Sequence, residues 1–264
     1  MLVDSHCHLD FPQLYDNLTD VLENARCNNV GKLLNICTKR DSINQVIKIS
    51  EQYPSIYHAI GSHPLYLHEE QPYTIDELIS HAHHPRMIGI GETGLDLHYR
   101  SDTLDKQINS FRTHIAASRL SNLPVIIHAR DADEEIINIL QEEHKQQPFY
   151  FVLHCFSSGK ELAEVAVDCG GYVSMSGIIT FKNSQTVRDI FKDIVPLERV
   201  LIETDSPYLA PAPMRGKSNE PAWVKYVAKE GANMYNMDFE DFTQITYENF
   251  TRLFPKIIDD TMTR

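Results

Sequence analysis

The sequence predicts an α/β fold of the (β/α)8 TIM barrel type, in which parallel strands form a closed ring inside a layer of helices. Short apolar, β-branched runs alternate along the chain with longer segments whose apolar residues recur every three or four positions. The length of 264 residues suits one such barrel. An open dinucleotide-binding sheet is disfavoured, because its glycine-rich fingerprint should follow an early strand, whereas Gly89-Ile90-Gly91-Glu92-Thr93-Gly94 begins in the fourth run instead of the first.

Eight runs are predicted to be strands. They cover residues 2–4, 32–37, 56–61, 87–91, 125–127, 150–153, 172–176 and 200–202. The intervening segments carry helical stripes, such as Leu104, Ile108, Phe111 and Ile115. Two more helices are expected after the last strand, near 222–234 and 239–253. Since no linker or internal repeat interrupts the alternation, residues 1–264 are expected to form a single domain.

Composition indicates an acidic, folded and water-soluble chain. Lys and Arg number 24 against 37 Asp and Glu, which gives a formal charge of −13, and 42% of residues are hydrophobic. This balance disfavours the broad basic surface by which most nucleic-acid binders attract phosphates. No apolar run reaches the ~20 residues that span a bilayer, and the first residues do not resemble a secretory signal. With five cysteines, an odd number, we expect a cytoplasmic protein without membrane contact, and infer no obligate protein partner.

Residues able to bind metals or move protons follow the predicted strands. In chain order they are His6 and His8 after the first run, His63 after the third, Glu92 after the fourth, His128 after the fifth, His154 after the sixth and Asp205 after the eighth. In a barrel, all of these strand ends meet at the carboxyl-terminal face, where barrel enzymes place their catalytic groups.

The same residue types in this pattern predict a divalent metal site. His6 and His8 lie two residues apart on an extended segment, so both imidazoles can reach one ion. Four imidazoles (His6, His8, His128 and His154) and two carboxylates (Glu92 and Asp205) suit one or two divalent cations. Glu92 can bridge two cations, and Asp205 can act as a ligand or accept a proton from attacking water. The pattern therefore points to metal-assisted hydrolysis.

Successive motifs of the chain resemble those of TatD-family metal-dependent deoxyribonucleases of the amidohydrolase superfamily. The segments are Asp4-Ser5-His6-Cys7-His8-Leu9-Asp10, Gly61-Ser62-His63-Pro64, Gly91-Glu92-Thr93-Gly94-Leu95-Asp96, His128-Ala129-Arg130-Asp131-Ala132, His154-Cys155-Phe156-Ser157, Glu203-Thr204-Asp205-Ser206-Pro207-Tyr208-Leu209-Ala210-Pro211 and Arg215-Gly216-Lys217-Ser218-Asn219-Glu220-Pro221. They follow the family's order from residue 4 to residue 221. Ser62, where a branched apolar residue is more usual, is a departure from the family pattern.

The resemblance implies a metal-dependent hydrolase with two divalent ions. One ion would be held by His6, His8, Glu92 and Asp205, and the other by Glu92, His128 and His154. Similar enzymes cleave phosphodiester bonds of DNA, typically as 3′-to-5′ exonucleases on single strands, so single-stranded DNA ends are the expected substrate. Magnesium, manganese and zinc all suit such a donor set, and the sequence does not choose among them.

Other polar residues are assigned supporting roles. His63 is expected to contact substrate or phosphate and to assist catalysis. Glu203, two residues before Asp205, is expected to orient the site. Arg130 and Arg215, with Lys217, are candidates for gripping phosphate oxygens.

Two alternatives to a nuclease remain. The protein could hydrolyse carboxylic esters, lactones or amides, as other branches of the superfamily do. Several of those branches bridge their metals with a modified lysine at the fourth strand end, whereas this chain has Glu92 there. A non-catalytic scaffold that keeps a metal for stability is disfavoured, because structural zinc sites are closed and rich in cysteine. The sequence leaves DNA against RNA and strand polarity open.

Overall fold

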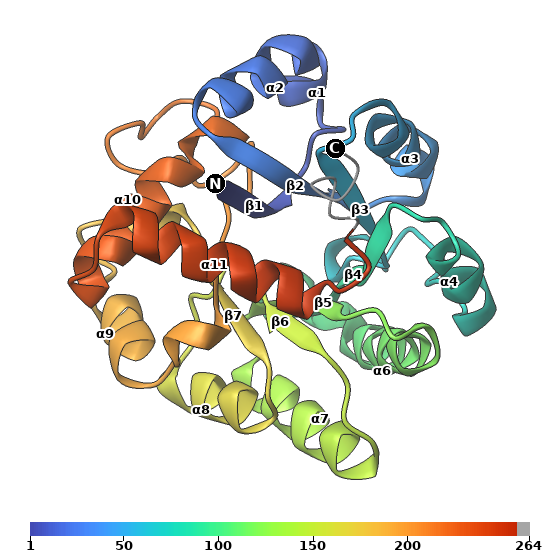
Figure 1. The fold of residues 1–264 in the computed structure, drawn as a ribbon. Coiled ribbons are helices and arrows are strands. Elements are labelled where there is room, and N and C mark those ends of the chain that lie inside the picture. Colours follow the sequence, from blue (N-terminus) through green and yellow to red (C-terminus); the bar gives the residue numbers. More distant parts are fainter. Residues whose placement is uncertain (258–264) are drawn as a thin grey trace.

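The computed structural model describes residues 1–257 of the chain. Its eight strands form one parallel sheet in sequential order from β1 to β8, and helices surround the sheet (Figure 1). The predicted (β/α)8 barrel is therefore confirmed. The strands are β1 Leu2–Cys7, β2 Val30–Cys37, β3 Ile56–Ile60, β4 Met87–Asp96, β5 Val125–Arg130, β6 Phe151–Leu153, β7 Tyr172–Met175 and β8 Val200–Ile202.

Each predicted run contains a strand, but three strands extend beyond the predicted carboxyl ends, and β2 begins at Val30, before the predicted start. β1 continues to Cys7, β4 to Asp96 and β5 to Arg130. The prediction ended these strands where the apolar run gives way to polar residues. The backbone nevertheless stays paired there, since Gly94 of β4 pairs with His128 of β5. The site residues on these strands are thus held by sheet hydrogen bonds rather than by loops.

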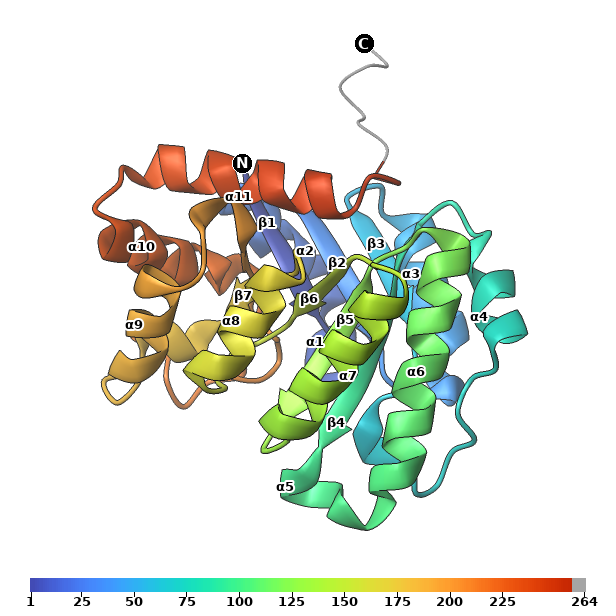
Figure 2. The same ribbon diagram turned by 90° about the horizontal axis from the view of Figure 1, so that it is seen from below.

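Helices follow nearly every strand and cover the outside of the barrel (Figures 1 and 2). They are α1 Pro12–Tyr15, α2 Leu18–Cys27, α3 Ile43–Gln52, α4 Ile75–Ala82, α5 Leu97–Arg100, α6 Leu104–Ser121, α7 Asp133–Gln146, α8 Lys160–Asp168, α9 Gln185–Asp193, α10 Val224–Tyr235 and α11 Phe239–Leu253. Short 3₁₀ helices occupy Arg40–Ser42, Pro64–Tyr66, Ser101–Thr103, Gly177–Thr180, Leu197–Arg199 and Pro221–Trp223. The two helices expected after the last strand correspond to α10 and α11.

The barrel closes through the segment that follows β8. The backbone N–H of Asp205 donates to the carbonyl of His6 at 2.9 Å, and the N–H of His8 donates to the carbonyl of Ser206 at 2.9 Å. The buried carboxyl group of Asp4 accepts hydrogen bonds from both the backbone N–H (2.8 Å) and the hydroxyl (2.6 Å) of Thr204. Asp205 is thereby fixed beside the end of β1.

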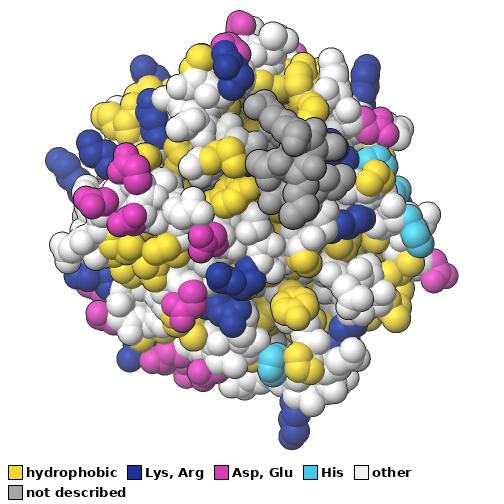
Figure 3. Space-filling model, viewed as in Figure 1, with side chains coloured by type: hydrophobic (Ala, Val, Ile, Leu, Met, Phe, Trp, Pro, Cys, Tyr) yellow, Lys and Arg dark blue, Asp and Glu magenta, His cyan; other side chains and the backbone are white. Residues whose placement is uncertain are grey.

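Helix α11 covers the amino-terminal end of the barrel, as Figure 2 shows. Phe250 of α11 and Phe254, which directly follows the helix, are fully buried against Val3, Tyr57 and Leu201 of the strands. In Figure 3, which faces this end, basic and acidic side chains are interspersed with apolar ones. Among residues 1–257, no helix is both long and apolar enough to cross a membrane.

Replacing Phe250 with alanine should lower the free energy of unfolding by about 3–5 kcal/mol, because the lost ring leaves a cavity that its neighbours only partly fill. Urea unfolding followed by circular dichroism measures the change. Leu120→Ala is the matched control: Leu120 is 69% exposed on α6, so its truncation should change stability by less than about 0.5 kcal/mol. Equal losses in both variants would contradict a closing role for α11.

Candidate metal centre

A cavity of about 380 Å³ opens at the carboxyl-terminal ends of the strands. The expected site residues converge there from six strands and the segments that follow them. Those that line the cavity are His8, His63, Glu92, His128, His154 and Asp205. His6 lies among the same side chains and is fully buried. Residues up to 199 positions apart in the sequence, His6 and Asp205, therefore face one another.

An irregularity in β4 directs Glu92 into this cavity. Ile90 pairs with Val125 and Thr93 with Ile127, so three steps along β4 face two steps along β5. Such a β-bulge turns a side chain away from the regular alternation. The bulge needs glycine at position 91, where φ is 146° and an added Cβ would lie 2.7 Å from the carbonyl oxygen of Ile126.

Glu92 lies at the centre of the donor set. Its Oε1 is 2.7 Å from His154 Nε2, 2.9 Å from His128 Nδ1 and 3.1 Å from His63 Nε2. Its other oxygen, Oε2, is 3.3 Å from His6 Nε2. The two carboxylate oxygens thus face different imidazoles, which is the arrangement expected of a carboxylate that bridges two cations.

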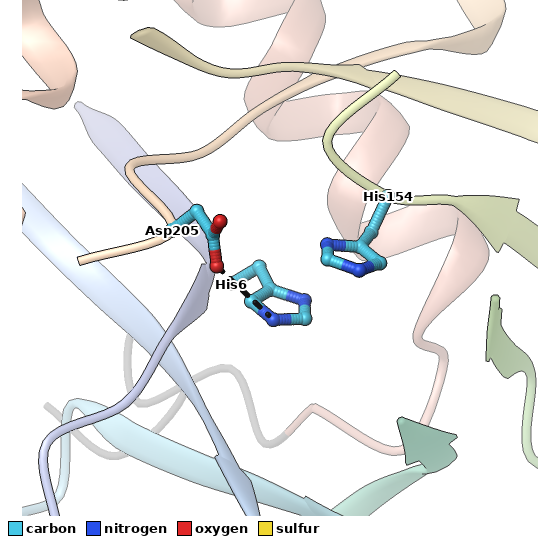
Figure 4. Close-up of side chains that lie close together, drawn as sticks. All are labelled: His6, His154 and Asp205. Atoms are coloured by element: carbon cyan, nitrogen blue, oxygen red, sulfur yellow. Dashed lines mark ion pairs between the residues drawn. The ribbon is translucent and has the colours of Figure 1, made fainter. Parts of the chain in front are cut away.

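Asp205 completes the side of the site near β1. Its Oδ1 is 3.3 Å from His8 Nε2 and 3.7 Å from His6 Nε2. Figure 4 shows Asp205 beside His6, with His154 approaching from the end of β6. The His6 and His154 rings stack at 3.9 Å between centroids. Asp205 has a φ of 56°, a left-handed conformation that is uncommon outside glycine and is often found at functional sites.

In His8 and His128, a hydrogen bond made by one ring nitrogen leaves the other nitrogen able to bind a cation. The carbonyl oxygen of Ile36 can only accept, so His8 Nδ1 donates to it at 3.2 Å and His8 Nε2 carries the lone pair. Likewise, the Asp96 carboxylate accepts from His128 Nε2 at 3.0 Å. Such carboxylate or carbonyl partners fix the orientation of metal-ligating histidines.

His154 is oriented in the same way by Glu203. Its Nδ1 lies 3.4 Å from Glu203 Oε1, and the hydroxyl of Ser174 donates to the other oxygen of Glu203. Glu203 is fully buried behind the ring. This position is compatible with the orienting role expected from the sequence.

In His63, the orienting hydrogen bond runs in the opposite direction: the ring accepts it instead of donating it. The backbone N–H of Leu65 donates to His63 Nδ1 at 3.1 Å, so this nitrogen has no proton and the neutral ring carries its proton on Nε2. Burial lowers the pKa of His63, partly offset by Glu92, which favours the neutral form. His63 Nε2 is therefore a hydrogen-bond donor toward Glu92 and the cavity.

Without cations, the carboxylates and imidazoles compensate one another. Burial alone would raise the pKa of Glu92, but the charge of His154, the interaction with His63 and the hydrogen bonds from His128 and His154 hold it well below its ordinary value. Burial opposes protonation of His154 and His128. The interactions with Glu92, and with Glu203 for His154 and Asp96 for His128, outweigh burial and raise the pKa of both rings.

The donor set fits divalent cations. Three overlapping groups have ligand atoms within 4.8 Å of one another: His6, His154 and Asp205; His6, His8 and Glu92; and His63, Glu92 and His128. Within the described residues, both ring nitrogens of His6 and Oε2 of Glu92 are buried without a hydrogen-bond partner, although His6 Nε2 lies 3.3 Å from that oxygen. Buried polar atoms of this kind call for a partner, and a cation would supply it. The hydrogen bond from Leu65 makes His63 the poorest ligand of the set.

The two arginines expected to grip phosphate lie in different surroundings. Arg130, at the end of β5, lines the cavity with its guanidinium 5.1 Å from the centroid of the Tyr99 ring. Arg215 is directed to Phe181, 4.1 Å from that ring's centroid, and Phe181 lines an outer groove. Lys217 is exposed.

Sequence reasoning gave no role to Asp96 or Asp4. Asp96 is fully buried and holds His128, while Asp4 anchors the segment that carries Asp205. Both residues belong to motifs that carried the family resemblance, which was the available signal. Their partners could not be read from spacing, because Asp4 and Thr204 are 200 positions apart.

A (β/α)8 barrel with this donor cluster at the carboxyl-terminal ends of its strands defines the class of metal-dependent hydrolases. The comparisons agree with this class: a family model described as TatD related DNase matches residues 3–255. The chain belongs to the TatD related DNase family.

Individual relatives match along nearly their whole length. The chain is 40% identical over 257 residues to YabD of Bacillus subtilis, covering 96% of this chain and 99% of YabD. It is 41% identical over 256 residues to YcfH of Escherichia coli K12, covering 96% and 95%. Both are named uncharacterized metal-dependent hydrolases. The crystal structure of YjjV, a TatD homolog from E. coli K12, superposes with a TM-score of 0.89 at 25% identity, covering 96% of this chain and 98% of YjjV.

Cation binding should release protons and weaken as the pH falls. The pKa values of His128 and His154 are raised, so both rings keep their protons to higher pH, and a cation must displace those protons. Isothermal titration of zinc into chelator-treated protein, in buffers of different ionisation enthalpy, measures the protons released. Glu92→Gln should weaken binding by at least about tenfold, since loss of even a residue that only orients a ligand typically costs about 10- to 100-fold. His84→Ala, an imidazole at the opposite end of the barrel, should bind as the unmodified chain does; equal weakening in both variants would refute the assigned site.

Proposed function

We propose that the protein is a two-metal phosphodiesterase that removes nucleotides from the ends of single-stranded DNA in the 3′-to-5′ direction. The observation that carries the proposal is the placement of Glu92, whose two oxygens face separate sets of imidazoles. His6, His8 and Asp205 would hold one cation with Glu92. His128 and His154 would hold the other, also with Glu92.

Two divalent cations in this position would activate water and neutralise charge that develops on a phosphoryl group. The protein's own residues perform the remaining tasks. Asp205, whose Oδ1 faces His8, accepts the proton of the attacking water. His63 donates from Nε2 to a phosphoryl oxygen once Glu92 is engaged by cations. Arg130, at the edge of the cavity, orients the phosphate.

The description of the matching family, TatD related DNase, supports DNA as the substrate. The charge of −13 is compatible with it. Two cations would add about four positive charges at the cavity floor, so the local field and the net charge can differ in sign. An enzyme that holds only a few terminal nucleotides does not need an extended basic surface.

The surroundings of the cavity favour the ends of a DNA strand over its internal positions. An outer groove of about 880 Å³ shares Arg130, Ser157 and Leu209 with the cavity. Its lining includes four acidic side chains, Asp131, Asp133, Glu134 and Glu135. Negative charge there opposes the phosphates of a strand that continues in this direction, so the strand is expected to end near the cavity.

End-labelled single-stranded DNA with magnesium, manganese, zinc or a chelator tests bond, polarity and metal together. Shortening from the 3′ end with at least one metal and none with chelator is the expected result. Glu92→Ala and Asp205→Ala should each reduce turnover by at least about 10²-fold without unfolding the protein, because each removes an interaction made with the reacting groups. Circular single-stranded DNA, which has no ends, should resist.

Four outcomes would contradict the proposal. Full activity in either alanine variant would remove the assigned residue from the reaction. Rapid cutting of circular DNA would replace the exonuclease with an endonuclease. Turnover of small carboxylic esters or lactones without turnover of DNA would assign the site to a different bond, and shortening of RNA but not DNA would change the substrate.

His63→Ala should lower turnover while leaving cation affinity unchanged, because His63 donates a hydrogen bond and is not needed as a ligand. Loss of one such donor typically costs about 10²-fold in turnover. Titration calorimetry and single-stranded DNA digestion measure the two quantities in parallel. A large loss of cation affinity in His63→Ala would place this ring among the ligands instead.

A further inference from the structure

Two exposed tyrosines stand at the rim of the metal-site cavity. Tyr99 is 59% exposed and Tyr208 is 50% exposed, and both line the cavity. Large aromatic side chains lose favourable burial when they remain in water. Two such rings on one cavity therefore suggest that a flat apolar group covers them when the site is in use.

The two tyrosines lie on opposite sides of the barrel mouth. Tyr99 is in α5, which directly follows β4, and Tyr208 follows β8. Since the strands are in sequential order and the segment after β8 bonds to β1, β4 and β8 are four strands apart in either direction. The donor atoms around Glu92 occupy the floor between them. A phosphodiester placed over that floor would extend its two nucleosides toward the two rims.

Each tyrosine is supported by a neighbour suited to base binding. The guanidinium of Arg130 lies 5.1 Å from the Tyr99 ring centroid, and guanidinium planes stack on bases as aromatic rings do. Tyr208 packs edge-on against Phe11 at 6.0 Å between centroids, and Phe11 stacks on the imidazole of His8 at 4.9 Å. The second rim is thus joined by ring contacts to one of the metal-site imidazoles.

We propose that Tyr99 and Tyr208 are the two base-stacking platforms of a dinucleotide subsite. In this subsite, Tyr99, against which Arg130 packs, holds the base on one side of the scissile phosphate, and Tyr208, against which Phe11 packs, holds the base on the other side. The inference rests on the proposed function and deepens it, because it identifies two adjacent nucleosides as the recognised unit. Stacking tolerates any base, so it selects nucleic acid without selecting sequence.

Binding is measured first without catalysis. Two probes are used, each a dinucleotide with a methylphosphonate linkage that resists hydrolysis. One carries 2-aminopurine at the first base and the other at the second, and each is added with magnesium to the full-length protein. Stacking on a ring quenches the fluorescence of 2-aminopurine. Tyr99→Ala and Tyr208→Ala should each weaken binding about 5- to 150-fold, and each should abolish quenching at one probe end only. Tyr99→Phe and Tyr208→Phe keep the ring and should bind within about twofold of the unmodified protein. Tyr150→Ala is the matched control, because Tyr150 is 63% exposed and precedes β6 at the other end of the barrel.

Digestion of single-stranded DNA with a normal or an abasic terminal nucleotide gives the second measurement. The alanine variants should lose kcat/KM on normal ends, and at least one of them should match the unmodified protein on abasic ends. Unchanged binding in both alanine variants, failure of both phenylalanine variants to restore binding, or equal losses on normal and abasic ends would each overturn the inference. Tyrosine-dependent quenching without DNA hydrolysis under any metal would leave base binding in place and refute the phosphodiesterase.

Discussion

The structure is organised around one buried carboxylate. Glu92 is 1% exposed, and its pKa lies well below the ordinary value, so it is an anion removed from water. Burial of an unpaired ion costs several kcal/mol, and only closely placed positive or hydrogen-bonding partners offset this cost. Four imidazoles from β1, β5 and the segments after β3 and β6 supply such partners. Each of these strands must therefore end at a level along the barrel axis that brings its imidazole within reach of the two carboxylate oxygens of Glu92.

Backbone irregularities make this convergence possible. In a regular strand, side chains alternate between the interior and the helices. β4 has its bulge at Gly91-Glu92, and β1 also shifts register, with three steps from Asp4 to Cys7 facing two steps of β2. Both shifts lie at residues that carry donors. Asp4 then fixes the segment after β8 through Thr204, which places Asp205 beside His6. The donor geometry thus depends on backbone pairing of β1 with β2, of β4 with β5, and of β1 with the segment after β8.

The sequence was sufficient to predict the order of the strands and the end of the barrel at which the site lies, because hydrophobic periodicity and strand-end polarity are local properties. It was not sufficient for features that depend on partners distant in the chain. The donor role of His63 follows from the N–H of Leu65, and the direction of Arg215 follows from Phe181. Ser62, unusual for the family, has polar partners on both sides: its backbone N–H donates to His114 Nε2, and its hydroxyl accepts from the backbone N–H of Tyr73. None of these contacts has a signature in residue spacing.

In the proposed function, cations at the cavity floor attract phosphate, and tyrosines at the rim contact the bases. These two separate contributions would allow an acidic protein to act on a polyanion. Without cations, the carboxylates and imidazoles of the floor compensate one another, so phosphate gains little by entering. Bound cations would make the floor positive, and by thermodynamic linkage a bound phosphodiester would then raise the affinity for the cations by the same factor. The acidic groove keeps its sign in both states. Additional phosphates beyond the cavity would therefore add little affinity, whereas the proposed stacking on the rim tyrosines would contribute affinity that does not require charge. Binding of this kind loses less with added salt than binding along a basic groove, because few counterions are released.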